Sequence, residues 1–338
     1  RAVSTRFMPA ISVILPTYNS VSTIQRAVRS ILDQTFEDLE LIIVDDGSQD
    51  GTRPLLESIR DHRIRIMAAE HQGVCQAANL GLKNAQSEWI SRMDADDYAY
   101  PDKLSQQMNY LKKNDLDATG CQVRILGSGG GRLGSLRRYE NWINTETLKP
   151  EAIHALRFVE FPIVNPTVVA RRKYFEIGFR QTDMPEDYDL FLLAAQLGIR
   201  FGKVPEILFD WYDSPGRLTR TDDRYSGMAF DRCRRLHLLA GPLKNCMKVD
   251  LWGVGKTGKP WLRWLLAEGF QVRHCYDVSP RRVGELIHGC PVLHPDVFSA
   301  ADGTPLLIAV GAKGARQQID GFIRNQGHSP GSDAWFVA

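Results

Sequence analysis

Three acidic clusters in this sequence have residue types and spacings that could do chemistry. Asp45-Asp46-Gly47-Ser48 and Asp94-Ala95-Asp96-Asp97 each follow a short apolar run, and Glu186-Asp187-Tyr188-Asp189 follows Pro185 at the start of a helical pattern. Crowded carboxylates repel one another unless a cation lies between them, and Mg²⁺ and Mn²⁺ prefer oxygen ligands of this kind. A carboxylate in the first turn of a helix stays ionised and could accept a proton from a hydroxyl group. The clusters therefore predict a divalent-cation site and a general base.

Each cluster also has a purely structural interpretation. The first could form a turn and cap the next helix, the second could be a solvated acidic turn, and the third could only cap its own helix. The position of the first two clusters at the ends of two strands favours function, because ligands of open α/β sheets bind at the carboxyl ends of the strands.

Alternating strand and helix patterns over the first 110 residues predict a parallel sheet with covering helices. Strands are expected at 11–15, 39–44, 64–67 and 88–93, and helices at 24–32, 54–59, 74–84 and from Pro101 onward. The glycine-rich start and weak periodicity of residues 127–150 predict a long surface excursion. Beyond it, we expect a strand at 163–170, a helical face with Leu190 and Leu197, and a basic helix after Pro215.

A second α/β unit is predicted near the C-terminus. Strand patterns at 249–252, 272–276 and 306–310 surround a helix that starts at Trp261, so the fold class is α/β with domains at 9–243 and 244–338. Trp261 and Trp264 are expected in the core of this second unit.

The glycine-rich turn of the second unit fits the dinucleotide-binding fingerprint. Gly253, Gly255 and Gly258 follow a strand and precede a helix, and Asp277 lies nineteen residues after Gly258. Glycine N–H groups and a helix N-terminus can cradle phosphates, and Lys256 adds a positive charge. Pro260 replaces the Ser or Thr of a P-loop, so we exclude a P-loop NTPase; a turn that is only structural remains the alternative.

Composition excludes several other classes of protein. The 338 residues include 42 basic and 40 acidic side chains, a net charge of +2, which argues against broad capture of nucleic acid. The six cysteines form no C-x-x-C pair and are expected to be reduced thiols. The apolar runs are too short to span a bilayer, and the first seven residues lack the apolar region of a signal peptide. We expect a cytoplasmic protein of undetermined oligomeric state. Peripheral contact with the inner face of a membrane through Arg232, Arg234 and Arg235 is an alternative to a solvated helix face.

Five segments, taken in order, carry a family resemblance. They are Ile11–Asn19 (ISVILPTYN), Val44–Ser48 (VDDGS), His71–Gly81 (HQGVCQAANLG), Met93–Asp97 (MDADD) and Glu186–Leu190 (EDYDL). Together they resemble family 2 glycosyltransferases, which are inverting enzymes of the GT-A fold, over about residues 9–225.

This resemblance implies a role for each matching residue. The nucleotide pocket would be lined by Pro16, Thr17, Tyr18 and Asn19, the base would be read by Asp46 and Asp45, and the nucleoside would be covered by Gly73 and Asn79. Asp94 would lie near the ribose and diphosphate, and Asp96 would bind the metal. Asp187 would be the general base, with Glu186 beside it. Asn165 departs from the family pattern, which often has His there. The segment Trp211–Pro215 lacks the Q-x-x-R-W signature of processive synthases, so a single-transfer enzyme is favoured.

The resemblance therefore implies a metal-dependent transferase that uses Mn²⁺ or Mg²⁺ and moves a sugar from a nucleotide sugar, with UDP-sugar the first choice. The acceptor would be a glycan or lipid-linked hydroxyl in surface polysaccharide or glycolipid assembly. The segment Ile287–Val292 resembles the Rossmann-like, nucleotide-sugar-binding domain of sugar acyltransferases. Two alternatives stay open: an NAD(P)-dependent oxidoreductase centred on the second unit, and a non-catalytic nucleotide-sugar sensor.

Overall fold

The computed structural model describes residues 8–127, 133–298, 301–312 and 314–338, which form two compact units. The first unit comprises the described residues up to Pro150 together with Ile163–Cys233. The second comprises Glu151–Pro162 and Arg234–Ala338. The second unit thus begins near residue 234, compared with the expected 244, and it includes an excursion from the middle of the chain.

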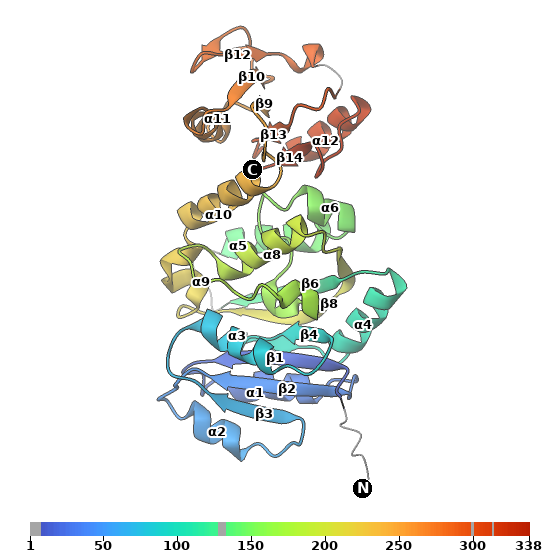
Figure 1. Ribbon diagram of the computed structural model, residues 1–338, viewed down its shortest axis with the longest axis vertical. Helices are drawn as coiled ribbons and strands as arrows, with labels where there is room; N and C mark the ends of the chain where they lie inside the picture. The colour runs from blue at the N-terminus through green and yellow to red at the C-terminus, as the bar shows by residue number, and fades with distance from the viewer. Residues whose placement is uncertain (1–7, 128–132, 299–300, 313) are drawn as a thin grey trace. The chain divides into compact units, whose positions relative to one another are not determined.

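The first unit is built on an eight-stranded mixed sheet with the strand order β3-β2-β1-β4-β7-β6-β8-β5 (Figure 1). Its N-terminal half is parallel: β1 (Ile11–Thr17) lies between β2 (Leu39–Asp45) and β4 (Trp89–Arg92), and β3 (Ile64–Ala68) is the edge strand. Every residue of β1 and β2 is buried, as is typical of strands covered on both faces. This confirms the predicted parallel sheet.

The second half of the sheet contains antiparallel pairs. Strand β7 (Val169–Arg171) runs antiparallel to β4 and to β6 (Ala118–Gly127), and β5 (Tyr98–Ala99) runs antiparallel to β8 (Phe201–Asp213). Strands β6 and β8 pair in parallel through two register shifts. The first shift leaves Pro205 and Glu206 without partners on β6, and a bulge of this kind accommodates a proline inside a strand.

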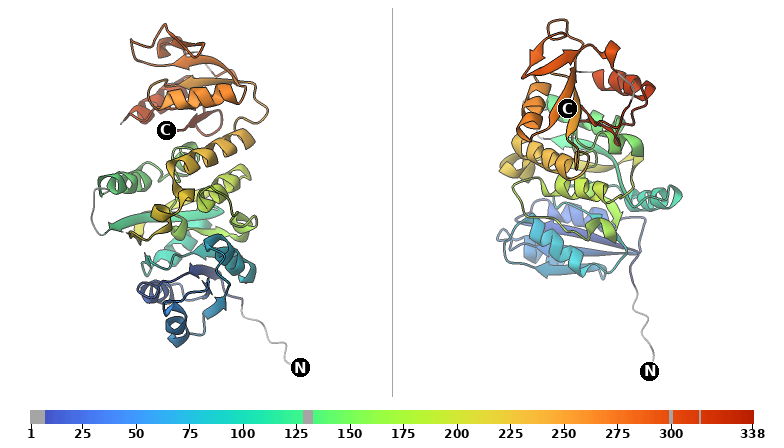
Figure 2. Two further views of the ribbon diagram at one scale, coloured as in Figure 1. Left: turned by 90° about the vertical axis from the view of Figure 1, so that its left-hand side faces the viewer. Right: turned by 45° about the horizontal axis from the view of Figure 1, so that its top comes forward.

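Helices cover both faces of this sheet, as the two further views show (Figure 2). The helices of the first unit are α1 (Ile24–Leu32), α2 (Thr52–Ser58), α3 (Val74–Asn84), α4 (Lys103–Lys113), α5 (Leu133–Thr145), α7 (Arg172–Phe175), α8 (Glu186–Gln196) and α9 (Leu218–Thr221), with 3₁₀ turns η1 (Asn165–Thr167) and η2 (Asp223–Tyr225). Helix α3 packs on β1 and β2, and α4 packs on β6 and β8.

Two sequence expectations need correction here. The segment 127–150 is not a long irregular excursion, because α5 occupies Leu133–Thr145; residues 128–132 lie outside the described residues. The expected strand at 163–170 contains the 3₁₀ turn η1 at Asn165–Thr167, and the strand is limited to Val169–Arg171.

The second unit contains a six-stranded, mostly parallel sheet with the order β11-β12-β10-β9-β13-β14. Its strands are β9 (Lys248–Trp252), β10 (Gln271–Tyr276), β11 (Leu286–Ile287), β12 (Cys290–Leu293), β13 (Leu306–Ile308) and β14 (Ala334–Phe336). Its helices are α6 (Pro150–Ala155), α11 (Gly258–Ala267), α12 (Ala315–Asn325) and the 3₁₀ turn η3 (Pro295–Val297), and α10 (Gly227–Ala240) leads into it. Trp261 and Trp264 are buried with their rings in edge contact, which confirms their place in the core.

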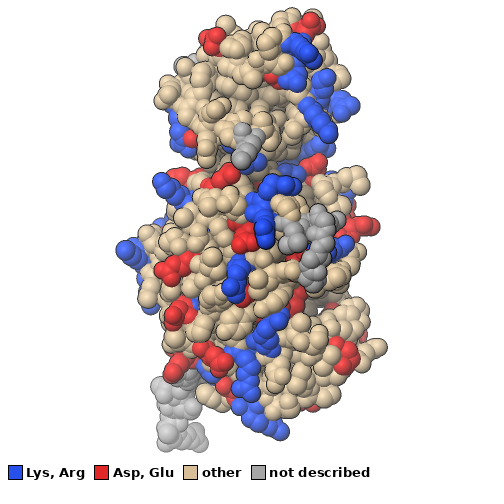
Figure 3. Space-filling model, turned by 180° about the vertical axis from the view of Figure 1, so that it is seen from behind, with Lys and Arg blue, Asp and Glu red and all other residues tan. Residues whose placement is uncertain are grey.

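Charged side chains of both signs are interspersed over the face shown in Figure 3. This pattern agrees with the nearly balanced composition and with the absence of a basic excess. Among the described residues, no helix has the length and apolar character needed to cross a membrane.

Candidate active site

The acidic clusters follow the carboxyl ends of two strands that flank β1. Asp45 ends β2, and Asp94 follows β4 by two residues. Because β2, β1 and β4 are parallel neighbours, these carboxylates lie at the same edge of the sheet. This is the edge at which open α/β sheets bind their ligands.

The second cluster is organised around Arg217, a residue that the motif analysis did not assign. Arg217 donates to both oxygens of Asp97, at 3.0 and 3.2 Å, and its Nη2 lies 3.1 Å from Asp94 Oδ2. Asp97 is fully buried, and its Oδ1 also accepts a hydrogen bond from the Tyr212 amide at 2.8 Å. Burial raises the pKa of Asp97 and the Arg217 charge opposes that rise, while the three aspartates raise the pKa of Arg217. Asp97 is therefore a structural anchor for Arg217.

Asp94 and Asp96 are the more accessible members of this cluster. Their side chains are 25% and 29% exposed, and carboxylate oxygens of Asp94, Asp96 and Asp97 lie within 4.8 Å of one another. Burial raises the pKa of Asp96, Arg217 opposes that rise, and the neighbouring charge of Asp94 adds to it. Oxygen ligands at this spacing fit a divalent cation held by Asp94 and Asp96, because these two side chains are partly exposed whereas Asp97 is fully buried. Such a cation would share Asp94 with Arg92 and Arg217, which each lie 3.1 Å from one of its oxygens.

The third cluster opens α8 and lies close to the second. Glu186 is buried, and both of its carboxylate oxygens lie 2.7 Å from the Tyr225 hydroxyl. Asp187 Oδ1 accepts a hydrogen bond from the Tyr188 amide at 2.7 Å. Burial, then the charge of Glu186, raises the pKa of Asp187 to about 8, and the charge of Asp94 contributes to the rise. The fold thus brings the first turn of α8 close to the Asp94–Asp97 cluster, although the two segments are about ninety residues apart in the sequence.

The residues assigned to the nucleotide come from the ends of β1 and β2 and from α3 with the loop before it. The rings of Tyr18 and His71 stack with centroids 3.9 Å apart, and Tyr18 is 43% exposed. Asp46 is buried and accepts hydrogen bonds from the amides of Gln72 and Gly73, at 3.0 and 2.8 Å. An aromatic surface thus lies beside a loop that Asp46 holds in place.

Several residues assigned to the nucleotide have intramolecular partners. Asp45 Oδ1 accepts from the Ser48 amide, and Asn19 Oδ1 accepts from the Gln49 amide at 2.8 Å. The side chain of Asn79 is paired with the backbone of Phe179 through both its oxygen and its nitrogen, each at 2.8 Å. These contacts give the three residues a structural role, and their nucleotide contacts remain predictions.

Among the described residues, the buried polar atoms without a hydrogen bond near this sheet edge include two oxygens. They are Thr17 Oγ1, on the last residue of β1, and Asn165 Oδ1, in η1, which packs against β4. Pro16 is buried within β1 and shapes the backbone before Thr17. Buried polar groups are nearly always paired, so each of these oxygens is a place where a ligand could bind.

Sequence reasoning missed four residues that complete the site. Arg217 binds the second cluster, Tyr225 binds Glu186, Arg92 lies 3.1 Å from Asp94, and Arg26 donates to the carbonyl of Asp96. None lies in a quoted motif. The three arginines between Pro215 and Tyr225 could have indicated that this segment pairs with the acidic clusters, because buried carboxylates require compensating cations.

The glycine-rich turn of the second unit is tightly packed. A side chain at Gly258 would lie 1.8 Å from the carbonyl oxygen of Gly253, so only glycine fits there. Gly255 faces the Arg282 guanidinium, and Lys256 is exposed. Asp277 accepts hydrogen bonds from the Val254 and Ser279 amides and from Arg282. Its carboxylate is therefore engaged within the protein, which argues against the ribose contact that a dinucleotide would need.

The three basic residues of α10 are also engaged. Arg232 lies 3.1 Å from Asp183, Arg234 donates to the carbonyl of Val159 at 2.7 Å, and the Arg235 guanidinium lies over the rings of Trp261 and Trp264. These contacts favour structural roles over binding to an anionic membrane.

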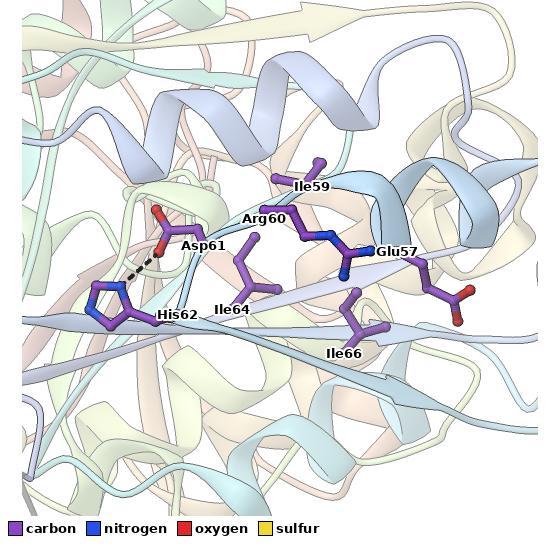
Figure 4. A pocket seen from close by; sticks show the side chains of 7 residues that line it. All are labelled: Glu57, Ile59, Arg60, Asp61, His62, Ile64 and Ile66. Atoms are coloured by element: carbon purple, nitrogen blue, oxygen red, sulfur yellow. Dashed lines mark ion pairs between the residues drawn. The ribbon is translucent and has the colours of Figure 1, made fainter.

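An open hollow lies elsewhere on the first unit, beside the edge strand β3 (Figure 4). It is lined by Glu57, Ile59, Arg60, Asp61, His62, Ile64 and Ile66. Residues 57–62 precede β3, so the hollow is at the amino end of that strand, whereas the acidic clusters follow carboxyl ends. It is not part of the candidate active site.

Comparison with known proteins identifies the family. Residues 12–178 match the family described as glycosyl transferase family 2. These residues form a family 2 glycosyltransferase domain. The domain contains the first two acidic clusters, and Glu186 and Asp187 lie eight and nine residues beyond its end.

Relatives and solved structures agree with this assignment. Two uncharacterised glycosyltransferases of Haemophilus influenzae are each 32% identical, over 166 and 209 residues, which is 45% and 59% of this chain. The chain spans 66% and 64% of their lengths. The structure of Staphylococcus aureus TarS 1–349 with UDP-GlcNAc has a TM-score of 0.52 and 20% identity, over 70% of this chain and 68% of that one. At that identity, the similarity shows the fold alone: the GT-A-like sheet.

Proposed function

We propose that this chain is an inverting glycosyltransferase that moves a sugar from a nucleoside-diphosphate donor to an acceptor hydroxyl. The observation that carries the proposal is the proximity of the two acidic clusters: the charge of Asp94 contributes to the raised pKa of Asp187. A donor diphosphate at Asp94 and Asp96 would therefore place its sugar beside a carboxylate.

The donor side has the charges that a diphosphate requires. Asp94 and Asp96 would hold Mn²⁺ or Mg²⁺, and such a cation neutralises diphosphate charge and so improves the leaving group. Arg217 is buried between the same aspartates and adds a fixed positive charge. The nucleoside would lie against the Tyr18 and His71 rings. The unpaired hydroxyl of Thr17, the last residue of β1, directly precedes Tyr18 in the chain.

In the third cluster, Asp187 is the carboxylate that the described structure pairs with a backbone amide alone and not with another side chain. Glu186 is engaged by Tyr225, and Asp189 is paired with Arg180 at 2.5 and 2.7 Å. Asp187 is left as the general base, and a pKa near neutrality is the most effective value for that task. The base removes the hydroxyl proton as the oxygen attacks C1, the bond from C1 to the diphosphate oxygen breaks, and the nucleoside diphosphate leaves; this single displacement inverts the stereochemistry.

The acceptor class that we propose is a glycan or lipid-linked sugar. Asn165 stands where relatives often carry His, and its buried, unpaired Oδ1 offers an acceptor for a sugar hydroxyl. Surface polysaccharide or glycolipid assembly is the setting that this chemistry suits.

A thermal-shift panel on the full chain tests the proposal. UDP is tested first, since the related fold of TarS holds UDP-GlcNAc, together with GDP, dTDP, CMP, NAD⁺ and NADP⁺, each with and without Mn²⁺. A ligand that binds only the folded state raises its stability, so one diphosphate should raise the melting temperature in a metal-dependent way. A shift with NAD(P) alone would favour an oxidoreductase, and nucleotide binding without transfer would favour a sensor.

For the second unit, we propose a phosphate-bearing small-molecule ligand without redox chemistry. The specific observation is that Gly255 faces the Arg282 guanidinium beside the N-terminus of α11, whose first turn has no acidic residue and no side-chain cap. The N–H groups of a helix N-terminus and the exposed Lys256 favour an anion, and Arg282, which is paired with Asp277 at 2.9 Å, lies at the same turn.

A further inference from the structure

We propose that Tyr225 is a positioning residue for sugar transfer: its hydroxyl fixes the Glu186 carboxylate and thereby holds the adjoining Asp187 in place as the general base. The inference rests on the proposed function, because it concerns the same site. Tyr225 ends the 3₁₀ turn η2, about forty residues beyond Glu186, in a segment outside the matched family domain.

The contact between the two residues is short and buried. The Tyr225 oxygen lies 2.7 Å from Glu186 Oε1 and 2.7 Å from Oε2, and the Glu186 side chain is 6% exposed. A phenol has one hydrogen to donate, so it bridges the two oxygens and occupies the open edge of the carboxylate. Arg224 adds a positive charge 4.0 Å from Oε2. Glu186 is thus held from η2.

The first turn of α8 depends on this contact. Pro185 is the N-cap of the helix and provides no side-chain hydrogen bond, so no capping side chain fixes the orientation of the turn. Asp187 is bonded to the amide of its own neighbour, Tyr188, which also belongs to the turn. The hydrogen bond from Tyr225 to Glu186 is therefore a tie from outside the helix to the residue next to the base.

The same segment also binds the donor cluster. Arg217, eight residues before Tyr225, is paired with Asp94 and Asp97. The segment between β8 and α10 therefore contacts the cation-binding cluster at one end and the base-bearing turn at the other. Loss of the Tyr225 contact should disturb the base and leave the donor cluster intact.

Tyr225 also decides where a proton resides. Burial raises the pKa of Glu186, and the hydrogen bond from Tyr225 is the largest effect that lowers it. An ionised Glu186 in turn raises the pKa of Asp187. Without the phenol, the pKa of Glu186 would rise further, and a protonated Glu186 would no longer raise the pKa of Asp187, which would then lose its proton at lower pH and be a weaker base.

The experiment is steady-state transfer by the full chain carrying Tyr225→Phe. We expect kcat to fall roughly ten- to hundred-fold, as small misplacements of a reacting group do. The donor KM and the metal-dependent Kd for UDP should stay within about twofold of the parent, on the same principle that separates transition-state from ground-state effects. The acid limb of the kcat profile should move to lower pH. A parental kcat and an unchanged pH profile would overturn the inference.

Two further variants keep the test sharp. Tyr100→Phe removes another phenol–carboxylate contact, the 3.1 Å bond to Asp210, and should leave kcat and its pH profile unchanged. Glu186→Gln keeps the shape of the side chain, and adding Tyr225→Phe to it should cause little further loss, because the two residues act as one unit. Additive losses would overturn the inference.

Failure of the inference can be told from failure of the proposed function. If Asp187→Asn abolishes transfer and Tyr225→Phe does not reduce it, only the role of Tyr225 is wrong. If Asp187→Asn retains parental transfer, the assignment of the base has failed, whatever Tyr225 does.

Discussion

Arg217 and Asp97 form a buried, two-point ion pair, with Nη1 3.0 Å from Oδ1 and Nη2 3.2 Å from Oδ2. Arg217 follows β8 and Asp97 follows β4, so the pair joins segments that are 120 residues apart. Bidentate pairs of this kind fix geometry as well as charge. Asp97 therefore sets the position of Arg217 beside Asp94 and Asp96.

Asp97→Ala is expected to destabilise the fold. Removing one partner of a buried ion pair costs about 3–5 kcal/mol, and we expect the lower end because Asp94 and Asp96 still face Arg217. Urea unfolding, followed by circular dichroism, would measure the loss. A midpoint equal to that of the parent would contradict this account of the pair.

Asp96→Ala should leave the stability of the fold unchanged and abolish its binding and transfer activity. Its side chain is 29% exposed, so truncation opens no core cavity and the unfolding midpoint should change little. Metal-dependent UDP binding and sugar transfer should be lost, because the cation loses one of two carboxylate ligands. Calorimetric titration of UDP with Mn²⁺ gives the answer, and parental affinity would exclude Asp96 as a metal ligand.

Asp187→Asn should retain donor binding and lose transfer by roughly two to four orders of magnitude, the usual contribution of a general base. The amide keeps the shape of the side chain. In the parent, transfer should rise with pH as Asp187 loses its proton, around its pKa of about 8 in the ligand-free protein. The rate of UDP-sugar turnover, measured from pH 6 to 9, would check both points; a variant with a parental rate and profile would require another base.

The parallel half of the sheet and its acidic clusters could be predicted from the sequence because their signals are local. Strands β1 and β2 are continuous apolar runs, and the clusters lie where those patterns stop. Strands β6 and β8 could not be predicted, since β8 contains Lys203, Pro205 and Glu206, residues that read as a loop. Their pairing depends on a bulge and on the burial of Lys203, which only tertiary contacts determine.

The residues that pair with the acidic clusters could not be predicted from the sequence for a similar reason. Arg217 and Tyr225 lie more than thirty residues beyond the carboxylates that they bind, and no local period connects them. For Asp46 and Asn79, the sequence suggested a function but not the structural contacts that the two side chains make. Their motif positions suggest a nucleotide, and the structure shows that they also hold α3 and its preceding loop in place.

Lys203 makes the stability of the fold depend on pH. It is buried, it donates to the Ile143 carbonyl and the Thr147 hydroxyl at 2.6 Å, and burial lowers its pKa to about 7. An unfolded lysine binds its proton up to about pH 10.4, so between pH 7 and 10 the unfolded state binds more protons and stability rises with pH. The slope from one such group is at most about 1.4 kcal/mol per pH unit.

Lys203→Met should therefore flatten this rise. Burial also lowers the pKa of Lys103, to about 8, so Lys103 would still make the free energy of unfolding rise with pH above that value. The free energy of unfolding, measured in urea at several pH values from 7 to 10, gives the slope. Lys112→Met, at an exposed position of α4, is the matched control and should leave the slope unchanged. An equal slope in parent and Lys203→Met would show that Lys203 keeps its proton in the fold.

Lys256→Glu tests the proposed anion site of the second unit. Lys256 is exposed on the turn before α11, so reversing its charge should not affect folding, while it should repel a phosphate placed at the helix N-terminus. The full chain with Asp96→Ala provides the background, because its donor site should no longer bind nucleotide. Calorimetry with UDP, pyrophosphate, NAD⁺ and NADP⁺ should show residual binding that Lys256→Glu weakens at least tenfold. Absence of binding in the Asp96→Ala background would leave the glycines as a tight turn only. Binding of NAD⁺ or NADP⁺ followed by reduction with an added substrate would instead assign redox chemistry to this unit, despite the engagement of Asp277 by Val254, Ser279 and Arg282.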